Sequence, residues 1–85
     1  MSAPAWVYLV RCADGSLYTG WTVDVPRRLE AHAAGASRYT RARLPVELVA
    51  SFPMESATAA RREEARIKRL TRSQKQALIK AAAGH

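Results

Sequence analysis

Two short segments rich in aromatic and β-branched residues flank the dipeptide Asp14-Gly15 near the start of the chain. Such residues favour strands, and Asp-Gly between two such segments is a strong β-hairpin signal. The sequence therefore predicts strands over residues 5–12 and 16–21. This hairpin constrains the fold most, because the elements that follow have to pack around it.

The residues after the hairpin predict a helix and then a third strand. Asp24 is a favourable N-cap, Pro26 is tolerated in the first turn, and Gly35 suits the end of a helix that runs to about Ala34. Residues 46–52 are typical of a strand, and we expect Pro53 to end it.

Two more helices are expected in the last third of the chain. Ser56 can cap a helix that runs to about Leu70, and the segment from Thr71 to Gln74 fits a capping box that begins another. The predicted fold is α+β, with a three-stranded antiparallel or mixed sheet, helices packed on it, and the order β-β-α-β-α-α.

The chain has 85 residues, which allows one domain over residues 1–85 with a core from about 5 to 80. Cys12 is the single cysteine, so no internal disulfide can form, and there is no Cys/His cluster for structural zinc. No apolar run approaches the roughly 20 residues of a membrane span, and the start does not resemble a signal peptide. We therefore expect a monomer in the cytoplasm, with no membrane partner.

The charge of the chain is strongly one-sided. The net charge is +7, and the whole excess lies in residues 36–85, which hold eleven Lys or Arg and four Asp or Glu. Such a balance on a small domain favours a polyanionic partner, with nucleic acid first. A charge run can also be a solvated surface, so composition alone does not predict an enzyme.

Several residues stand out as candidates for chemistry. Tyr8 and Tyr18 lie on the two predicted hairpin strands. Arg28 and His32 are four residues apart, so they share one helix face and can project together into a cleft. Two neighbouring glutamates, Glu63 and Glu64, lie in a basic helix, and the helical periodicity does not choose between them.

The register of the hairpin tests whether the two tyrosines can act together. A strict two-residue turn at Asp14-Gly15 would pair Tyr8 with Trp21 and place Tyr8 and Tyr18 on opposite faces of the sheet. A shared site requires a bulge or a loop of three or five residues near positions 13–16. We therefore expect such a loop, with Gly15 at positive φ.

These motifs together resemble the GIY-YIG nuclease superfamily, in particular its small standalone bacterial YhbQ-like group. Val7-Tyr8 and Tyr18-Thr19-Gly20 match the two halves of the motif, and the match continues through residues 26–32 and the glutamate helix at 60–70. The chain departs from the pattern in two ways. Trp6 stands where the first half has glycine, and no asparagine is present to follow the glutamate helix, a place that Thr71, Ser73 or Gln74 could take.

The resemblance implies a metal-dependent endonuclease that hydrolyses phosphodiester bonds in DNA, in repair or recombination. Tyr8 and Tyr18 would be the motif tyrosines, Arg28 would contact the scissile phosphate, and His32 matches a position that holds His or Tyr in relatives. Glu64 would hold Mg²⁺ or Mn²⁺, because its spacing to Ile67 and Lys68 fits. A hard cation often has one protein carboxylate, with waters and phosphate oxygens completing its shell.

We expect the nucleic acid to contact a basic loop at residues 38–43, the segment from 61 to 72 and the start of the first helix. DNA is the expected partner, with RNA as an alternative. A binding module with little or no cleavage, and a catalytic subunit that needs a protein partner, also fit the sequence. The expected contacts are Arg27, Arg38, Tyr39, Thr40, Arg41, Arg43, Arg61, Lys68 and Arg72.

Overall fold

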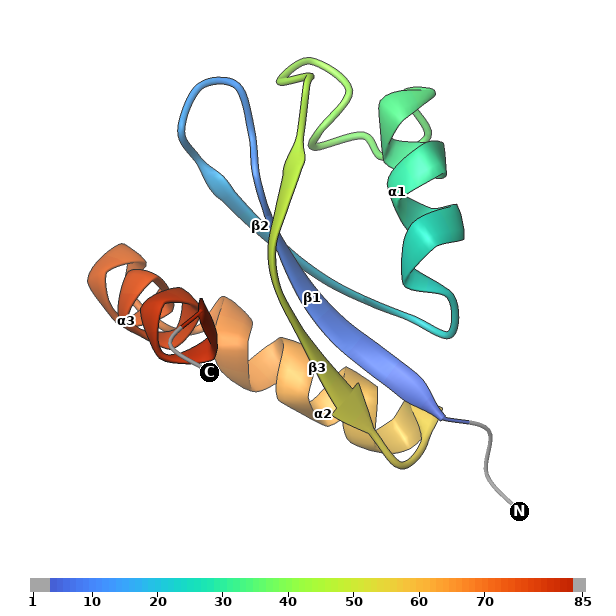
Figure 1. The fold of residues 1–85 in the computed structure, drawn as a ribbon, viewed down its shortest axis with the longest axis vertical. Coiled ribbons are helices and arrows are strands. Elements are labelled where there is room, and N and C mark those ends of the chain that lie inside the picture. The colour runs from blue at the N-terminus through green and yellow to red at the C-terminus, as the bar shows by residue number, and fades with distance from the viewer. Residues whose placement is uncertain (1–3, 84–85) are drawn as a thin grey trace.

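The computed structural model describes residues 4–83 and confirms the predicted α+β fold and element order (Figure 1). Residues 1–3 and 84–85, which the expected single domain includes, lie outside the described residues. The elements are β1 (Ala5–Arg11), β2 (Leu17–Thr22), α1 (Val25–Ala33), β3 (Glu47–Met54), α2 (Ala57–Lys68) and α3 (Arg72–Ala83).

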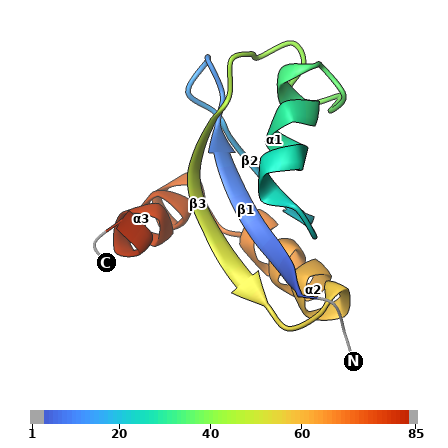
Figure 2. The ribbon, with the colours of Figure 1, turned by 45° about the vertical axis from the view of Figure 1, so that its right-hand side comes forward.

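The three strands form one antiparallel sheet in the order β2-β1-β3. The helices are divided between its two faces: α1 lies on one side, and α2 and α3 lie on the other (Figures 1 and 2). Side chains alternate along a strand, so β1 presents Val7 and Leu9 to one face and Tyr8 to the other. The central strand therefore serves the core and the candidate site at once.

The hydrophobic core lies between the sheet and the pair α2 and α3. Its members on the central strand and on α2 have no exposed surface, and side chains of α3 pack against them. The buried cluster contains Ala5, Val7, Leu9, Ala50, Ala60 and Ile67, with Leu70, Leu78 and Ile79 among the partly buried residues around it.

The hairpin register places both motif tyrosines on one face of the sheet. Tyr8 pairs with Gly20 and Val10 with Tyr18, so Tyr8 and Tyr18 point the same way. The strands are joined by the five residues 12–16, in which the Cys12 N–H donates to the Ser16 carbonyl at 2.8 Å and Gly15 has φ +86°. The expectation was a bulge or a loop of three or five residues, and the structure has the five-residue loop. The expected positive φ of Gly15 is confirmed.

The predicted helix starts are confirmed by their capping contacts. Asp24 accepts a hydrogen bond from the Arg27 N–H at 3.1 Å, and Ser56 accepts one from the Ala59 N–H at 3.1 Å. Thr71 and Gln74 exchange two such bonds, at 2.9 and 3.1 Å, which is the reciprocal pattern of a capping box. Within residues 4–83, none of the helices has the length and apolar character needed to cross a membrane.

The end of β3 differs from the expectation. Pro53 does not end the strand, which continues to Met54 with Pro53 paired to Trp6. The expectation was wrong because β3 is an edge strand, where the missing proline N–H can face away from the ladder.

Candidate active site

The hydroxyl of Tyr8 lies between two side chains of α1. Arg28 Nε donates to Tyr8 Oη at 3.2 Å, and Tyr8 Oη lies 2.9 Å from His32 Nε2. Both Tyr8 and His32 are only 1% exposed. Three of the five expected catalytic side chains therefore meet at one buried point, because Arg28 and His32 share a helix face and Tyr8 points toward it.

The second ring nitrogen of His32 contacts the basic loop. His32 Nδ1 lies 2.7 Å from Thr40 Oγ1, and Thr40 has no exposed surface. The expectation that Thr40 contacts nucleic acid is therefore wrong: a fully buried hydroxyl bonded to His32 cannot reach a phosphate on the surface. The sequence pointed to the right loop but not to the direction of this side chain.

Burial and charge set the protonation of the site. Burial raises the pKa of Tyr8, opposed by its hydrogen bond to Arg28, and the charge of Glu64 raises it further. Burial, together with the nearby Arg28 charge, lowers the pKa of His32. Near neutral pH the site therefore holds a protonated phenol beside a neutral imidazole, which is a proton donor next to a proton acceptor.

Tyr18 completes an aromatic group around His32. The Tyr18 ring centroid lies 5.4 Å from that of His32 in an edge-on arrangement and 6.5 Å from that of Tyr8. The Tyr18 ring centroid also lies 5.5 Å from the ring centroid of Tyr39, a residue of the loop before β3. Tyr18 is thus held among rings and is partly exposed.

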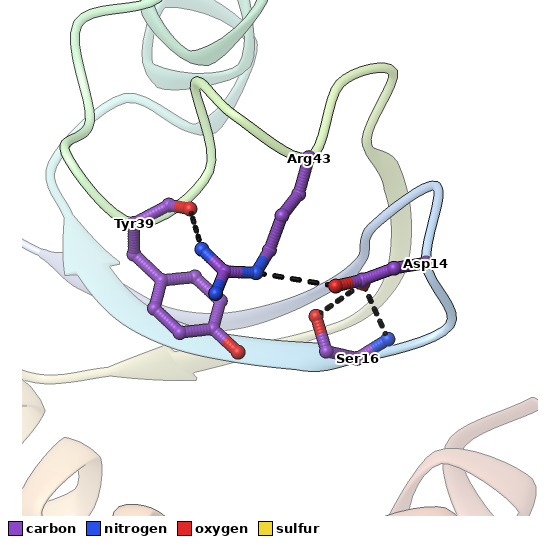
Figure 3. Close-up of polar contacts among 4 residues, drawn as sticks. All are labelled: Asp14, Ser16, Tyr39 and Arg43. Atoms are coloured by element: carbon purple, nitrogen blue, oxygen red, sulfur yellow. Dashed lines mark hydrogen bonds and ion pairs between the residues drawn. The ribbon is translucent and has the colours of Figure 1, made fainter.

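Figure 3 shows that Arg43 ties this loop to the hairpin. Its guanidinium lies 4.2 Å above the Tyr39 ring, donates to the Tyr39 carbonyl at 2.6 Å, and donates through Nε to Asp14 at 3.2 Å. Asp14 also accepts hydrogen bonds from the N–H and the hydroxyl of Ser16. These two bonds lower the pKa of Asp14 more than the nearby Arg43 does. The role of Asp14 was missed because the sequence presented it only as a turn residue.

Gly20 provides the space in which Tyr8 lies. A Cβ at position 20 would come within 2.5 Å of Tyr8 Oη and 2.6 Å of Tyr8 Cζ. Glycine is therefore required at position 20, the third position of the second motif half, because the ring of Tyr8 fills the space of a side chain.

The structure separates the two neighbouring glutamates of α2. Glu63 accepts two hydrogen bonds from the guanidinium of Arg66, at 2.6 and 2.9 Å. Glu64 has a side chain only 20% exposed, pairs loosely with Lys68 at 3.7 Å, and lies close enough for its charge to act on Tyr8. Of the two glutamates, Glu64 is the one whose charge contributes to the pKa of Tyr8.

The donors at this site suit a hard divalent cation. Residues 4–83 contain no cluster of three or more metal-ligating His, Cys, Asp or Glu side chains. Mg²⁺ commonly takes one or two carboxylates and keeps several waters alongside phosphate oxygens. A partly buried carboxylate such as Glu64 fits such a cation, and it does not fit a closed structural zinc site.

The residues expected to bind nucleic acid are mostly exposed. The Arg61 guanidinium lies 5.9 Å from the Trp21 ring, and the guanidinium of Arg72 approaches Gly15 in the hairpin loop. Arg43 differs, since Asp14 and Tyr39 already bind its guanidinium. The exposed members are Arg27, Arg38, Tyr39, Arg41, Arg61, Lys68 and Arg72.

A three-stranded antiparallel sheet with two tyrosines on one face, an Arg and a His on the first helix and a glutamate on the second defines a recognisable class of domain. A family model described as the GIY-YIG catalytic domain matches residues 4–77. The chain belongs to the GIY-YIG family, a family of nucleases.

The relatives place the chain in a smaller group within that family. It is 48% identical to UPF0213 protein SAG0778 of Streptococcus agalactiae over 94% of this chain and 92% of that protein. It is 49% identical to UPF0213 protein VNG_2274C of Halobacterium salinarum over 86% of this chain and 96% of that protein. The expected resemblance to a small standalone group is confirmed.

Two solution NMR structures share the fold. The UPF0213 protein BH0048 of Bacillus halodurans is 43% identical, with a TM-score of 0.61 over 92% of this chain and 84% of that chain. Protein EF2693 of E. faecalis is 34% identical, with a TM-score of 0.65 over 96% and 88%.

Proposed function

We propose that this chain is a divalent-metal-dependent endonuclease that hydrolyses phosphodiester bonds in DNA. The observation that carries the proposal is the buried Tyr8 hydroxyl between Arg28 and His32, with the charge of Glu64 acting on it. Membership of a nuclease family and a net charge of +7 support a phosphodiester substrate.

Tyr8 acts as the proton acceptor for the attacking water. Its raised pKa keeps it protonated at neutral pH, so it has to lose its own proton as it accepts one. Neutral His32, 2.9 Å away, takes that proton on Nε2 while the water proton moves to Tyr8 Oη. The aromatic contacts of Tyr18 with His32 hold the imidazole in place for this transfer.

Arg28 stabilises the charge that develops on the phosphate oxygens. Its hydrogen bond to Tyr8 raises the pKa of Arg28, so the guanidinium stays charged throughout. The same bond orients the guanidinium toward the atom that activates water. A preorganised cation beside the reacting group is worth more in a partly dehydrated site than in water.

Glu64 holds the divalent cation, Mg²⁺ or Mn²⁺, in this proposal. A divalent cation held by Glu64 would supply Lewis-acid stabilisation of the phosphate. The side chain of Glu64 is partly buried, and its ion pair with the exposed Lys68 is long, at 3.7 Å. Such a pair contributes little to stability. Lys68 could therefore leave Glu64 to the cation and pair with a phosphate instead.

The exposed basic residues of the loop and of α2 bind the DNA backbone, and RNA is a second possible substrate that the same contacts would serve. The chain acts as a monomeric single domain in the cytoplasm, in repair or recombination. A DNA-binding module without cleavage is the second candidate, favoured by one observation: the sequence holds no asparagine for the place after the glutamate helix.

Cleavage of labelled duplex, single-stranded, flap and branched DNA in Mg²⁺ or Mn²⁺ tests the proposal, with EDTA as the metal control. Glu64→Gln and Glu63→Gln are a matched pair on adjacent positions. We expect Glu64→Gln to abolish cleavage and the thermal stabilisation by Mn²⁺, and to keep DNA binding. Glu63→Gln should keep all three.

Folded wild-type protein that binds these DNAs without cutting any of them would support the binding module or the need for a protein partner. Equal loss of cleavage in both variants would show that Glu64 is not the specific metal ligand.

A further inference from the structure

We propose that Thr40 is a positioning residue that fixes the tautomer of His32, so that Nε2 is free to accept the proton of Tyr8. The inference rests on the proposed function for its catalytic consequence. The contact itself, 2.7 Å between Thr40 Oγ1 and His32 Nδ1, stands on the structure alone.

One arrangement of protons gives every donor in the hydrogen bonds around Tyr8 and His32 an acceptor. Arg28 is always a donor, so the Tyr8 oxygen accepts from Nε and directs its own proton elsewhere. Among the contacts of residues 4–83, His32 Nε2 is the acceptor within reach of that proton. A neutral imidazole with an acceptor at Nε2 carries its hydrogen on Nδ1, and the group that receives this hydrogen is Thr40.

Burial strengthens the preference for this arrangement of protons. His32 is 1% exposed and Thr40 is not exposed at all, so solvent does not readily replace the Thr40 oxygen beside His32 Nδ1. Without the Thr40 oxygen, the Nδ1 hydrogen would have no acceptor, and the imidazole would favour the other tautomer. With hydrogen on Nε2, His32 would donate to Tyr8 and could not take its proton.

The logic is that of other catalytic histidines, in which a third group fixes the orientation and tautomer of the imidazole. Here the third group is a neutral hydroxyl and not a carboxylate. A carboxylate would favour the charged imidazolium, whereas burial and the charge of Arg28 lower the pKa of His32 and favour the neutral ring. Thr40 therefore orients His32 without raising the pKa of the imidazole.

Nitrogen-15 NMR of the histidine ring measures the tautomer directly, without any need for cleavage. In the wild type we expect His32 to carry its hydrogen on Nδ1. Thr40→Val keeps the shape of the side chain and removes the oxygen, and it should shift the population toward hydrogen on Nε2. Thr40→Ser keeps the oxygen and should keep the wild-type tautomer.

Kinetics then measure the consequence. Thr40→Val should lower kcat on the order of 10²-fold, within the usual contribution of general acid–base catalysis, with KM little changed. Ser37→Ala removes another buried hydroxyl from the same loop and is the matched control, with kcat expected close to wild type.

A wild-type His32 with hydrogen on Nε2 would overturn the inference, and so would a Thr40→Val variant with an unchanged tautomer or an unchanged kcat. If Thr40→Val does not fold, the spectra of the wild type and of Thr40→Ser decide the assignment. A wild type that cuts no DNA would overturn the proposed function, and the ring spectra would still decide whether Thr40 fixes the tautomer.

Discussion

The ring of Tyr8 crosses directly over Gly20, its partner on the neighbouring strand, and leaves no space for a side chain there. The ring is held from above by Arg28 and His32, so it cannot move away without breaking those bonds. The two halves of the motif are thus joined by steric fit as well as by chemistry.

Gly20→Ala should destabilise the protein by about 1–3 kcal/mol, the usual cost of overpacking a tight site. The new Cβ would lie 2.5 Å from Tyr8 Oη and force the ring out of its bonds. Urea unfolding measures the change in the free energy of unfolding. In a Tyr8→Ala background the same substitution should cost much less, and an equal cost in both backgrounds would contradict the steric explanation.

Tyr8→Phe should lower kcat about 10²- to 10⁴-fold, the range for loss of a general base, and leave the fold intact. The ring still fills its place, and only the oxygen between Arg28 and His32 is lost. Ser37→Ala is the control, because it removes a buried hydroxyl to which no role in catalysis or binding is assigned. Comparable losses of kcat in the two variants would show that the Tyr8 hydroxyl has no special role.

The lowered pKa of His32 makes stability depend on pH in a definite direction. The unfolded chain binds a proton at this histidine near pH 6.5, and the folded site resists it, so stability is fully present above that pH. The free energy of unfolding should fall as the pH drops from 7.5 to 5.5, by at most about 1.4 kcal/mol per pH unit.

Urea unfolding of the wild type and of His32→Gln at several pH values measures this dependence. We expect His32→Gln to reduce the slope, and His85→Gln serves as the control for the other histidine of the chain. A slope that disappears only in His85→Gln would refute the assignment to His32.

DNA binding should weaken steeply with salt. If about five basic side chains contact phosphates, log K should fall with log salt with a slope near −4.5 on duplex and −3.5 on single strands. Replacing Arg41 or Arg61, both exposed, should each reduce the duplex slope by about 0.9. Arg66→Gln should leave it unchanged because Glu63 already binds that guanidinium, and an equal effect of Arg66→Gln would argue against a defined binding face.

The parts of the fold that could be predicted from the sequence are those that local patterns determine. Asp24, Ser56 and the Thr71–Gln74 pair act within three residues along the chain, so their capping roles are visible in the sequence. The register could also be inferred, because Tyr8 and Tyr18 share one face only if the hairpin loop has an odd number of residues or a bulge shifts the register. The expectation for Pro53 was wrong because the effect of a proline depends on whether its strand lies at the edge of the sheet, and local sequence patterns do not give the strand order.

The parts of the site that could not be predicted are contacts between segments far apart in the sequence. Arg43 reaches Asp14 across 29 positions, and Thr40 turns inward to His32. In a basic loop, an arginine that binds phosphate and one that binds a carboxylate of another loop look the same. Only the packed structure shows which side chains face the solvent.

The five-residue hairpin loop, residues 12–16, has a consequence for insertions and deletions. Surface loops usually tolerate changes in length. Here the loss or gain of one residue would turn every side chain of β2 to the opposite face, with Tyr18 against the core and Thr19 in the site. Length variants of this loop that keep the site should therefore gain or lose an even number of residues. A library of such variants could be sorted by the odd or even length of the loop before any variant is made.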